Sequence, residues 1–356
     1  MTAKKISKAK VKKAKPKKTV LKKVHKVKKT VKRTIKKAAV KKVKKPAKKV
    51  TGKNTVFRKL SSVKQLEIKA LEVREDLIRM LAYAGSGHSA GPLDLADIFT
   101  ALYFNILNHN PKRPWDPKRD RLIVSNGHIC PVWYTALAHA GYFPKEEIKT
   151  LRKFGTRLQG HPHMHSAPGV ENSAGPLGQG ISLAAGVAYG AKMDKKKYTV
   201  YCSMGDGELQ EGQCWEAFMF AAKYKLDNLI VFVDRNYIQI DGNTEDVMPL
   251  DPLDKKFESF GWNAINIDGH DFKEIINGFK KAKSVKGKPT VIIAKTVPGK
   301  GVFYMEGKYQ WHGKPPTKDQ AEIALQELAT KEMKMKGIKC TRCEVTLDSC
   351  VCVEGE

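Results

Sequence analysis

The chain has 356 residues and a formal net charge of +30, but that charge is unevenly distributed. Residues 1–53 hold 25 of the 66 Lys and Arg residues and none of the 36 Asp and Glu residues. The remainder has 41 basic and 36 acidic residues, a net charge of +5. It contains no apolar run of about 18 residues, so we expect no membrane span. These numbers predict a polycationic tail joined to a nearly balanced globular body.

The tail, residues 1–53, consists mainly of Lys, Val, Ala and Thr. Like-charge repulsion and a scarcity of large apolar side chains predict that it is disordered. Such a tail could bind nucleic acid without sequence preference by releasing counterions, and it lacks the aromatic side chains that would stack on bases. It resembles neither a secretory signal nor an Arg- and Ser-rich transit peptide, which predicts a cytoplasmic protein.

The body begins with a helix predicted over residues 63–81, a Gly-rich loop over 84–92 and a second helix over 93–106. His88 lies in this loop, where a His is either a catalytic candidate or a loop-packing residue. A strand over residues 120–125 and a helix over 132–140 follow. His128 lies between them, just past the carboxyl end of the strand, where α/β sheets place ligands.

His161, His163 and His165 alternate in the next segment. No Cys or carboxylate lies close to them, and Pro162 interrupts any regular element, so a zinc site is disfavoured. Residues 173–180 then form a second Gly-rich turn, which allows the backbone to approach a ligand closely. A helix of small residues is predicted over 181–191.

The most informative stretch is a β-α-β unit. Apolar runs at residues 198–204 and 228–234 flank an amphipathic segment at 211–226. Asp206 follows the first strand and Asn236 follows the second. Because parallel strands end at the same edge of a sheet, we expect these two side chains to face one point.

The residues at that point predict a site for Mg²⁺ and a diphosphate. Asp206 and Asn236 supply side-chain oxygens, and the Ile238 carbonyl can supply a third, which suits the octahedral preference of Mg²⁺. The N–H groups of Gly207 and Glu208 begin the following helical region and are expected to point at phosphate oxygens.

The last elements alternate in the same way. A strand is predicted over residues 264–268, a helix over 272–282, a strand over 290–296 and a closing helix over 319–336. Alternating strands and helices predict an α/β fold with a mainly parallel sheet, formed by residues 54–336.

Several segments together resemble the transketolase family of thiamine diphosphate enzymes. They occur in the order and spacing of the family, and they are Ser86–His88, Ser125–His128, Gly160–Pro162, Gly175–Gly180, Gly205–Gly207 with Asn236, Ile238–Gly242 and Trp311–Gly313. The resemblance covers about residues 60–330. It implies the three-layer αβα sandwich of the thiamine diphosphate-binding fold.

The resemblance also implies roles for the matched positions. Ligands of Mg²⁺ would be Asp206, Asn236 and the Ile238 carbonyl; cofactor contacts would be His128, Gly175, Leu177, Gly207, Glu208, Asn236 and Ile240. The residues lining the reacting carbon would be His88, His128, His161 and His312. Imidazoles suit proton transfer to and from sugar hydroxyls because His titrates near neutral pH.

Transketolases transfer a two-carbon ketol unit from a ketose phosphate to an aldose phosphate, as in the pentose phosphate pathway. Full-length members continue for several hundred residues and include a Glu that activates the aminopyrimidine. This chain ends at residue 356 and is therefore similar to the N-terminal subunit of a split transketolase. We expect it to be inactive alone and to act with a C-terminal subunit in an α₂β₂ assembly.

Two alternatives remain at this point. The chain could belong to another thiamine diphosphate enzyme, such as a deoxyxylulose phosphate synthase or an E1 dehydrogenase component. It could also be a polyanion-binding protein with an inactive enzyme body, although the Asp206 and Asn236 pair and the four His argue against that.

The C-terminal segment, residues 337–356, contains Cys340, Cys343, Cys350 and Cys352. Two closely spaced thiol pairs in a reducing compartment are compatible with a structural Zn²⁺ site. The alternative is a flexible tail with adventitious thiols, and the single residue between the last two Cys is a tighter spacing than zinc pairs usually have.

Overall fold

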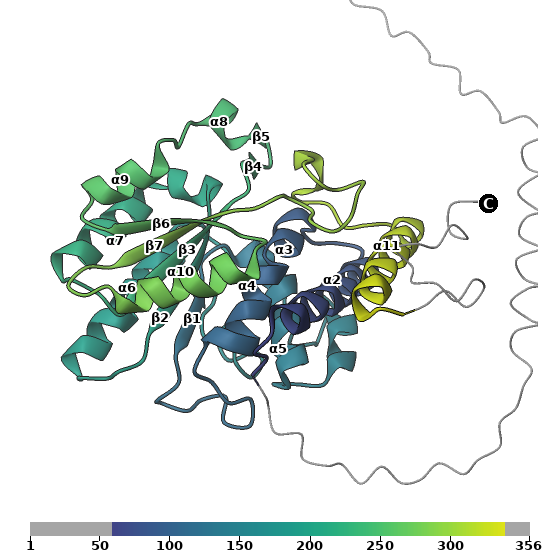
Figure 1. Ribbon diagram of the computed structural model, residues 1–356, viewed down its shortest axis with the longest axis horizontal. Coiled ribbons are helices and arrows are strands. Elements are labelled where there is room, and N and C mark those ends of the chain that lie inside the picture. Colours follow the sequence, from purple (N-terminus) through teal and green to yellow (C-terminus); the bar gives the residue numbers. More distant parts are fainter. Residues whose placement is uncertain (1–58, 339–356) are drawn as a thin grey trace, which may run out of the picture. The chain divides into compact units, whose positions relative to one another are not determined.

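The computed structural model describes residues 59–338 (Figure 1). The Lys-rich tail and the four C-terminal cysteines lie outside the described residues, as do the predictions made for them. Within the described range, no helix is both long and apolar enough to cross a membrane.

The centre of the fold is a parallel five-stranded sheet. Its strands lie in the order β1 (Arg121–Val124), β2 (Val200–Gly205), β3 (Leu229–Arg235), β7 (Thr290–Lys295) and β6 (Asn263–Asp268). The register pairs Val200 with Leu229 and Ile230 with Thr290, so the strands start at one edge and end at the other. The predicted β-α-β unit is confirmed, with β2 and β3 as neighbours.

The central strands are apolar on both faces because helices cover both. In β3, Ile230 and Phe232 belong to one hydrophobic core, whereas Val231 and Val233 belong to the other. Successive strand residues point to opposite faces, so a strand buried on both sides is a continuous apolar run rather than an alternating one. The fold is therefore the expected three-layer α/β sandwich.

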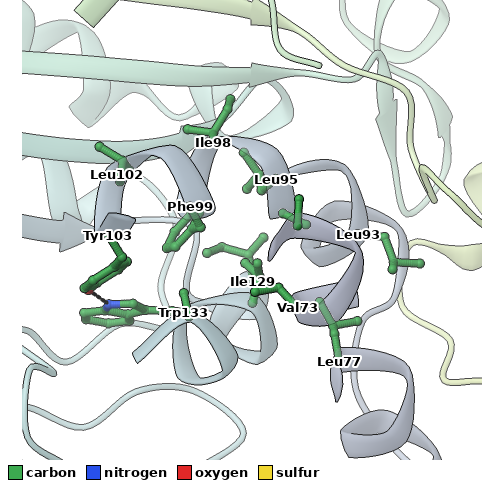
Figure 2. Packing of buried hydrophobic residues seen from close by; sticks show 14 of the residues in the cluster. Val73, Leu77, Leu93, Leu95, Ile98, Phe99, Leu102, Tyr103, Ile129 and Trp133 are labelled. Atoms are coloured by element: carbon green, nitrogen blue, oxygen red, sulfur yellow. Dashed lines mark hydrogen bonds between the residues drawn. The ribbon is translucent and has the colours of Figure 1, made fainter. Parts of the chain in front are cut away.

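The larger core lies between one sheet face and α10 and continues among a group of packed helices. These are α2 (Val63–Ala84), α3 (Ala90–Asp94), α4 (Ala96–Ala101), α5 (Cys130–Ala140), α10 (Phe272–Ser284) and α11 (Lys318–Lys336). Figure 2 shows the interior of this group, where the indole N–H of Trp133 donates to the Tyr103 hydroxyl over 2.7 Å. That bond satisfies two buried polar groups within an otherwise apolar cluster.

The second core covers the opposite sheet face. Its helices are α6 (Gln179–Met193), α7 (Gly212–Lys223) and α9 (Leu253–Ser259). Small residues along α6, such as Ala184, Ala185 and Ala188, are buried against the strands, which explains the small-residue composition of this helix. A short hairpin, β4 (Ile238–Gln239) and β5 (Gly242–Asn243), and α8 (Thr244–Val247) follow β3.

The structure differs from the sequence prediction mainly at helix ends. The helix predicted over residues 93–106 is split into α3, α4 and a π-helical turn over Leu102–Ile106, in which the N–H of Leu107 bonds to the carbonyl of Leu102. The helix predicted over 211–226 is preceded by a 3₁₀ turn, Gly207–Gln210. Further 3₁₀ turns occur at Gly127–Ile129, Lys145–Thr150 and Tyr309–Trp311. Apolar periodicity does not distinguish these hydrogen-bonding patterns.

Candidate functional site

The carboxyl edge of the sheet gathers the predicted motifs. The segment containing His128 follows β1, Asp206 follows β2 and Asn236 follows β3. This edge is where open parallel sheets bind ligands, because the strand-to-helix loops leave a crevice there. The expectation that Asp206 and Asn236 lie at one edge is thus confirmed.

Three histidines from distant segments form a cluster at this edge. The ring centroids of His88 and His128 are 5.0 Å apart, those of His88 and His312 are 5.5 Å apart, and those of His128 and His312 are 5.2 Å apart. The Nδ1 atoms of His88 and His312 are buried and have no hydrogen-bond partner among the described residues. Buried polar atoms without partners are uncommon and indicate a place for a ligand or water.

The surroundings of the cluster keep its imidazoles neutral. Burial lowers the pKa of His88 to about 4, and the nearby His312, Arg152 and His161 act in the same direction. Burial also lowers the pKa of His128 and His312. Neutral rings carry one donor and one acceptor nitrogen, so near pH 7 the cluster can both give and accept protons.

His161 lies at the margin of this cluster and is exposed. A side chain at Gly175 would lie 4.0 Å from the His161 ring, so the two predicted site residues are neighbours. His163 lines the same surface hollow as His161, whereas His165 lies against Trp115, with ring centroids 4.6 Å apart.

Asp206 is almost fully buried and is surrounded by donors. Its Oδ1 accepts the Gly207 N–H over 2.7 Å, and its Oδ2 accepts from Arg235 Nη1 over 3.0 Å and from the Tyr237 N–H over 2.9 Å. Burial raises the pKa of Asp206, and the Arg235 guanidinium opposes that shift. The Gly207 N–H, expected to bind phosphate, is thus donated to Asp206 in this structure.

The Asn236 side chain has one allowed amide orientation. Its Nδ2 lies 3.0 Å from Asp94 Oδ2 and 3.0 Å from Asp234 Oδ2, while its Oδ1 accepts the Ile238 N–H over 3.1 Å. A backbone N–H can only donate, so the amide oxygen must face Ile238 and the NH₂ group must face the two Asp residues. The amide oxygen consequently points away from them, as a cation ligand at this position requires.

The two carboxylates that hold Asn236 are themselves buried. Burial and the neighbouring Asp234 raise the pKa of Asp94 well above its usual value, and burial raises the pKa of Asp234 to about 7. Thr296 donates its hydroxyl to Asp234 Oδ1 over 2.5 Å. A side chain at Gly91 would lie 4.0 Å from both Asp234 Oδ2 and His128 Nε2, so this carboxylate pair adjoins the histidine cluster.

Glu208 ties three turns together instead of presenting its side chain outward. Its carboxylate accepts a short hydrogen bond from the Ser125 hydroxyl, the Gly178 N–H over 2.8 Å and the Gly205 N–H over 3.1 Å. Burial raises the pKa of Glu208 to about 7, against the effect of these donors. The sequence interpretation assigned Glu208 a backbone contact with phosphate, and the structure adds this buried role for its side chain.

Glycine is required where the second Gly-rich turn approaches the first strand. A Cβ at Gly180 would come within 2.5 Å of Ser125, and Gly178 has a φ of +77°. The close approach seen here joins two protein segments, and the predicted approach of this turn to a ligand stays a prediction. Two predicted cofactor contacts lie exposed around this edge, with Leu177 36% and Ile240 69% accessible.

A buried ion network holds the loop that follows β7. The Arg74 guanidinium bonds to both oxygens of Asp97 over 2.8 and 2.7 Å, and His270 Nδ1 lies 2.8 Å from Asp97 Oδ2. His270 Nε2 accepts the Val297 N–H over 2.9 Å, so its Nδ1 must carry the proton donated to Asp97. Arg74 also donates to the Lys300 carbonyl over 3.1 Å, which anchors the far side of the loop.

Sequence reasoning missed Asp94, Asp234 and Arg235 as parts of the site. Asp94 carried a usable signal, because it is a carboxylate between Leu93 and Leu95 in a predicted apolar helix. Charged residues are rarely fully buried without a partner or a function. There was no such indication for Arg235, because an Arg at the end of a strand is ordinarily exposed.

The candidate cation site combines one carboxylate, one amide and one carbonyl. In the part of the chain that the structure describes, no three His, Cys, Asp or Glu side chains come together to hold a metal ion. Hard oxygen ligands of mixed type nevertheless fit Mg²⁺, which keeps several waters or substrate oxygens in its shell. The buried Asn126 amide, just after β1, also has no hydrogen-bond partner among residues 59–338 and leaves donors available to an anion.

Comparison with known proteins agrees with this arrangement. Residues 67–338 match the family model of the transketolase thiamine diphosphate-binding domain. The 6-deoxy-6-sulfo-D-fructose transketolase subunit of Clostridium sp. is 42% identical over 263 residues, which are 74% of this chain and 96% of that protein. An apulose-4-phosphate transketolase subunit of Actinobacillus succinogenes is 41% identical, over 75% of this chain and 97% of that protein.

Full-length transketolases match over part of their length. Human transketolase is 39% identical over 80% of this chain but 45% of its own length. The crystal structure of transketolase from Campylobacter jejuni superimposes with a TM-score of 0.71 at 36% identity, over 76% of this chain and 43% of that chain. This chain therefore belongs to the transketolase family and carries its thiamine diphosphate-binding domain.

Proposed function

We propose that the chain is the diphosphate-binding, N-terminal subunit of a split transketolase. With a C-terminal subunit it would transfer a two-carbon ketol unit from a ketose phosphate to an aldose phosphate, using thiamine diphosphate and Mg²⁺. The observation that carries this proposal is the cluster of His88, His128 and His312, which adjoins the buried Asp234 that holds Asn236. The subunit relatives span almost the same length of chain, which supports the split arrangement.

The residues of this chain suit the binding of cofactor and cation. Asp206, Asn236 and the Ile238 carbonyl would hold Mg²⁺, and Asn126 would face the diphosphate. Thiamine diphosphate, when bound, supplies the carbon nucleophile and the electron sink for breaking and forming the carbon–carbon bond. Leu177 and Ile240 would cover its rings, which accounts for two apolar side chains left accessible at the site.

The histidine cluster would transfer protons from and to the hydroxyl groups of the sugar. Cleaving the ketose requires a proton to leave the C3 hydroxyl, and joining the fragment to an aldehyde requires a proton to reach the new hydroxyl. His88 and His312 each have a buried, unpartnered Nδ1 among the described residues, and both stay neutral near pH 7. A neutral imidazole can accept the first proton and return it in the second half of the cycle.

The choice of donor tests the function. The chain is combined with a candidate C-terminal subunit from the same genome and offered xylulose 5-phosphate with ribose 5-phosphate, or pyruvate with glyceraldehyde 3-phosphate. Ketol transfer from xylulose 5-phosphate supports the proposal, whereas consumption of pyruvate indicates an activity like that of deoxyxylulose phosphate synthase. A chain that binds neither thiamine diphosphate nor Mg²⁺ would indicate an inactive enzyme body.

The sugar itself is the more variable part of the proposal. Two similar subunits are named for different sugars, 6-deoxy-6-sulfo-D-fructose and apulose 4-phosphate. The donor panel should therefore include both.

Replacing Asp94 by Leu is expected to weaken binding of thiamine diphosphate with Mg²⁺ by about 10–100-fold. Asp94 accepts one of the two hydrogen bonds that orient the Asn236 amide, and Leu has a similar size but no acceptor. Asp94→Asn should bind much more tightly than Asp94→Leu, because a side-chain oxygen remains to accept that bond. Cofactor titration followed by fluorescence quenching measures both variants; equal affinity of Asp94→Leu and the wild type would contradict the orienting role.

A further inference from the structure

The positive charge of the body is concentrated in three short segments. Residues 192–197, 223–227 and 280–288 together contain eleven Lys and two Asp, a net charge of +9. Residues 54–356 as a whole carry only +5, which leaves −4 for everything outside these segments. A body that is otherwise slightly acidic therefore has one strongly basic region, and such asymmetry creates a local positive potential.

The three segments lie side by side at the edge where the strands begin. They connect α6 to β2, α7 to β3 and α10 to β7, and these three strands are neighbours in the sheet (Figure 1). Asp227 joins the connections directly: its Oδ1 lies 2.9 Å from Lys192 Nζ, and its Oδ2 accepts the Gly287 N–H over 3.0 Å. The basic edge is thus opposite the carboxyl edge that carries the candidate site.

Little of this charge is neutralised locally. Asp227 forms an ion pair with Lys192, Asp120 Oδ2 lies 4.0 Å from Lys283 Nζ, and the remaining acid in the three segments is the exposed Asp194. Lys196, Lys197 and Lys286 are exposed, and none of the three has an ion pair within the described residues. Together with Lys283 and the paired Asp227 they line a concavity of about 140 Å³. The lysines therefore surround a hollow into which a chain of anionic groups can enter.

The start of the described body is also close to the basic edge. Lys59 donates to the Asn105 carbonyl over 2.9 Å and Lys283 donates to the adjacent Ile106 carbonyl over 3.3 Å, so these two lysines lie near each other. Lys59 lies six residues after residue 53, the end of the segment with 25 basic and no acidic residues. A second, strongly basic segment is therefore covalently attached a few residues from this edge.

We propose that the strand-start edge, with Lys196, Lys197 and Lys286 at its centre, binds the phosphodiester backbone of nucleic acid without sequence preference. A regularly charged polymer matches a net charge of +9 on the edge and a covalently joined tail of 25 basic residues. The lysines surround a polar hollow instead of flanking an apolar ridge, which favours a nucleic-acid strand over a planar bilayer. Binding here leaves the candidate catalytic edge open, and the proposal is independent of the proposed function.

The test uses the full chain and fluorescein-labelled single-stranded RNA and DNA 20-mers, with anisotropy measured from 50 to 300 mM salt. The variant carries Lys196→Glu, Lys197→Glu and Lys286→Glu. At 100 mM salt it should lose at least about tenfold in affinity, and its slope of log affinity against log salt should fall by about two to three. The matched control changes three exposed lysines elsewhere, Lys64→Glu, Lys273→Glu and Lys318→Glu, and should keep most of the affinity and slope.

Three outcomes would overturn the proposal. Equal losses in the variant and the matched control would show an effect of net charge alone. Loss of binding on deleting residues 1–53, with no effect of the three central substitutions, would assign binding to the tail alone. Retention on phosphatidylserine vesicles that depends on the three lysines, without RNA or DNA binding, would identify a membrane surface instead. Circular dichroism confirms that each variant is folded.

Discussion

The purified chain alone is expected to show no measurable ketol transfer, and adding the C-terminal subunit should raise the rate by at least about a thousandfold. The reason lies in the site described above, which presents a histidine cluster and a candidate cation site but leaves Leu177 and Ile240 accessible. If these apolar side chains cover the cofactor rings, a second protein surface is needed on the other side of the rings. That surface would exclude water and hold the cofactor in place. The proposed partner supplies that surface.

The measurement is a coupled assay of xylulose 5-phosphate and ribose 5-phosphate at fixed chain concentration and increasing partner concentration. Activity should saturate at a one-to-one ratio. A complex with His88→Ala serves as the control, because it must lose activity if the transfer occurs at this histidine cluster and not in a contaminating enzyme. Full activity of the single chain after size-exclusion chromatography would refute the need for a partner.

Replacing Asp206 by Ala is expected to weaken binding of thiamine diphosphate by at least about a hundredfold in the presence of Mg²⁺. The substitution removes a proposed cation ligand and the acceptor that holds the Tyr237 N–H. Tyr237 has a φ of +62°, an uncommon conformation for a residue other than glycine, so this segment depends on such anchors. The Asp206→Ala chain should still fold, because Arg235 keeps ion pairs with Glu245 and Asp251.

Thermal unfolding with and without ligand separates the two effects. In the wild type, ligand at a hundred times its dissociation constant should stabilise the fold by about 2.7 kcal/mol, whereas Asp206→Ala should show almost no shift. Without ligand, Asp206→Ala should lose roughly 2–4 kcal/mol, because the buried Arg235 loses one of its carboxylates. Asp246→Asn, an exposed acid in the same segment, is the matched control. A ligand-induced shift in Asp206→Ala equal to that of the wild type would remove Asp206 from the cation site.

The parallel sheet and the common edge of Asp206 and Asn236 could be predicted from local sequence. The two apolar runs around Asp206 and Asn236 defined neighbouring parallel strands, and parallel strands bring the residues after them to one edge. The exact helix ends could not be predicted, because a π turn and a 3₁₀ turn preserve the same apolar periodicity as an α-helix.

The histidine cluster and the buried partners of Asn236 and Asp206 depend on tertiary contacts, which apolar periodicity does not predict. His88 and His312 are separated by more than half of the chain, and their approach was expected only from the family resemblance. Their placement depends on loops held by contacts such as the Ser89 hydroxyl to the Lys314 carbonyl at 2.6 Å. Asp94 and Arg235 were missed for the same reason, since their partners lie in other elements.

Glu208 has a consequence for the kinetics of ligand binding. One buried carboxylate joins the turns at Ser125, Gly178 and Gly205, which come from three separate segments of the chain. Bringing these turns together therefore costs conformational entropy when the protein folds, and not when the ligand binds. A cofactor meeting such a rigid cradle needs little rearrangement of these turns, so its association can be limited by encounter and by assembly of the second subunit.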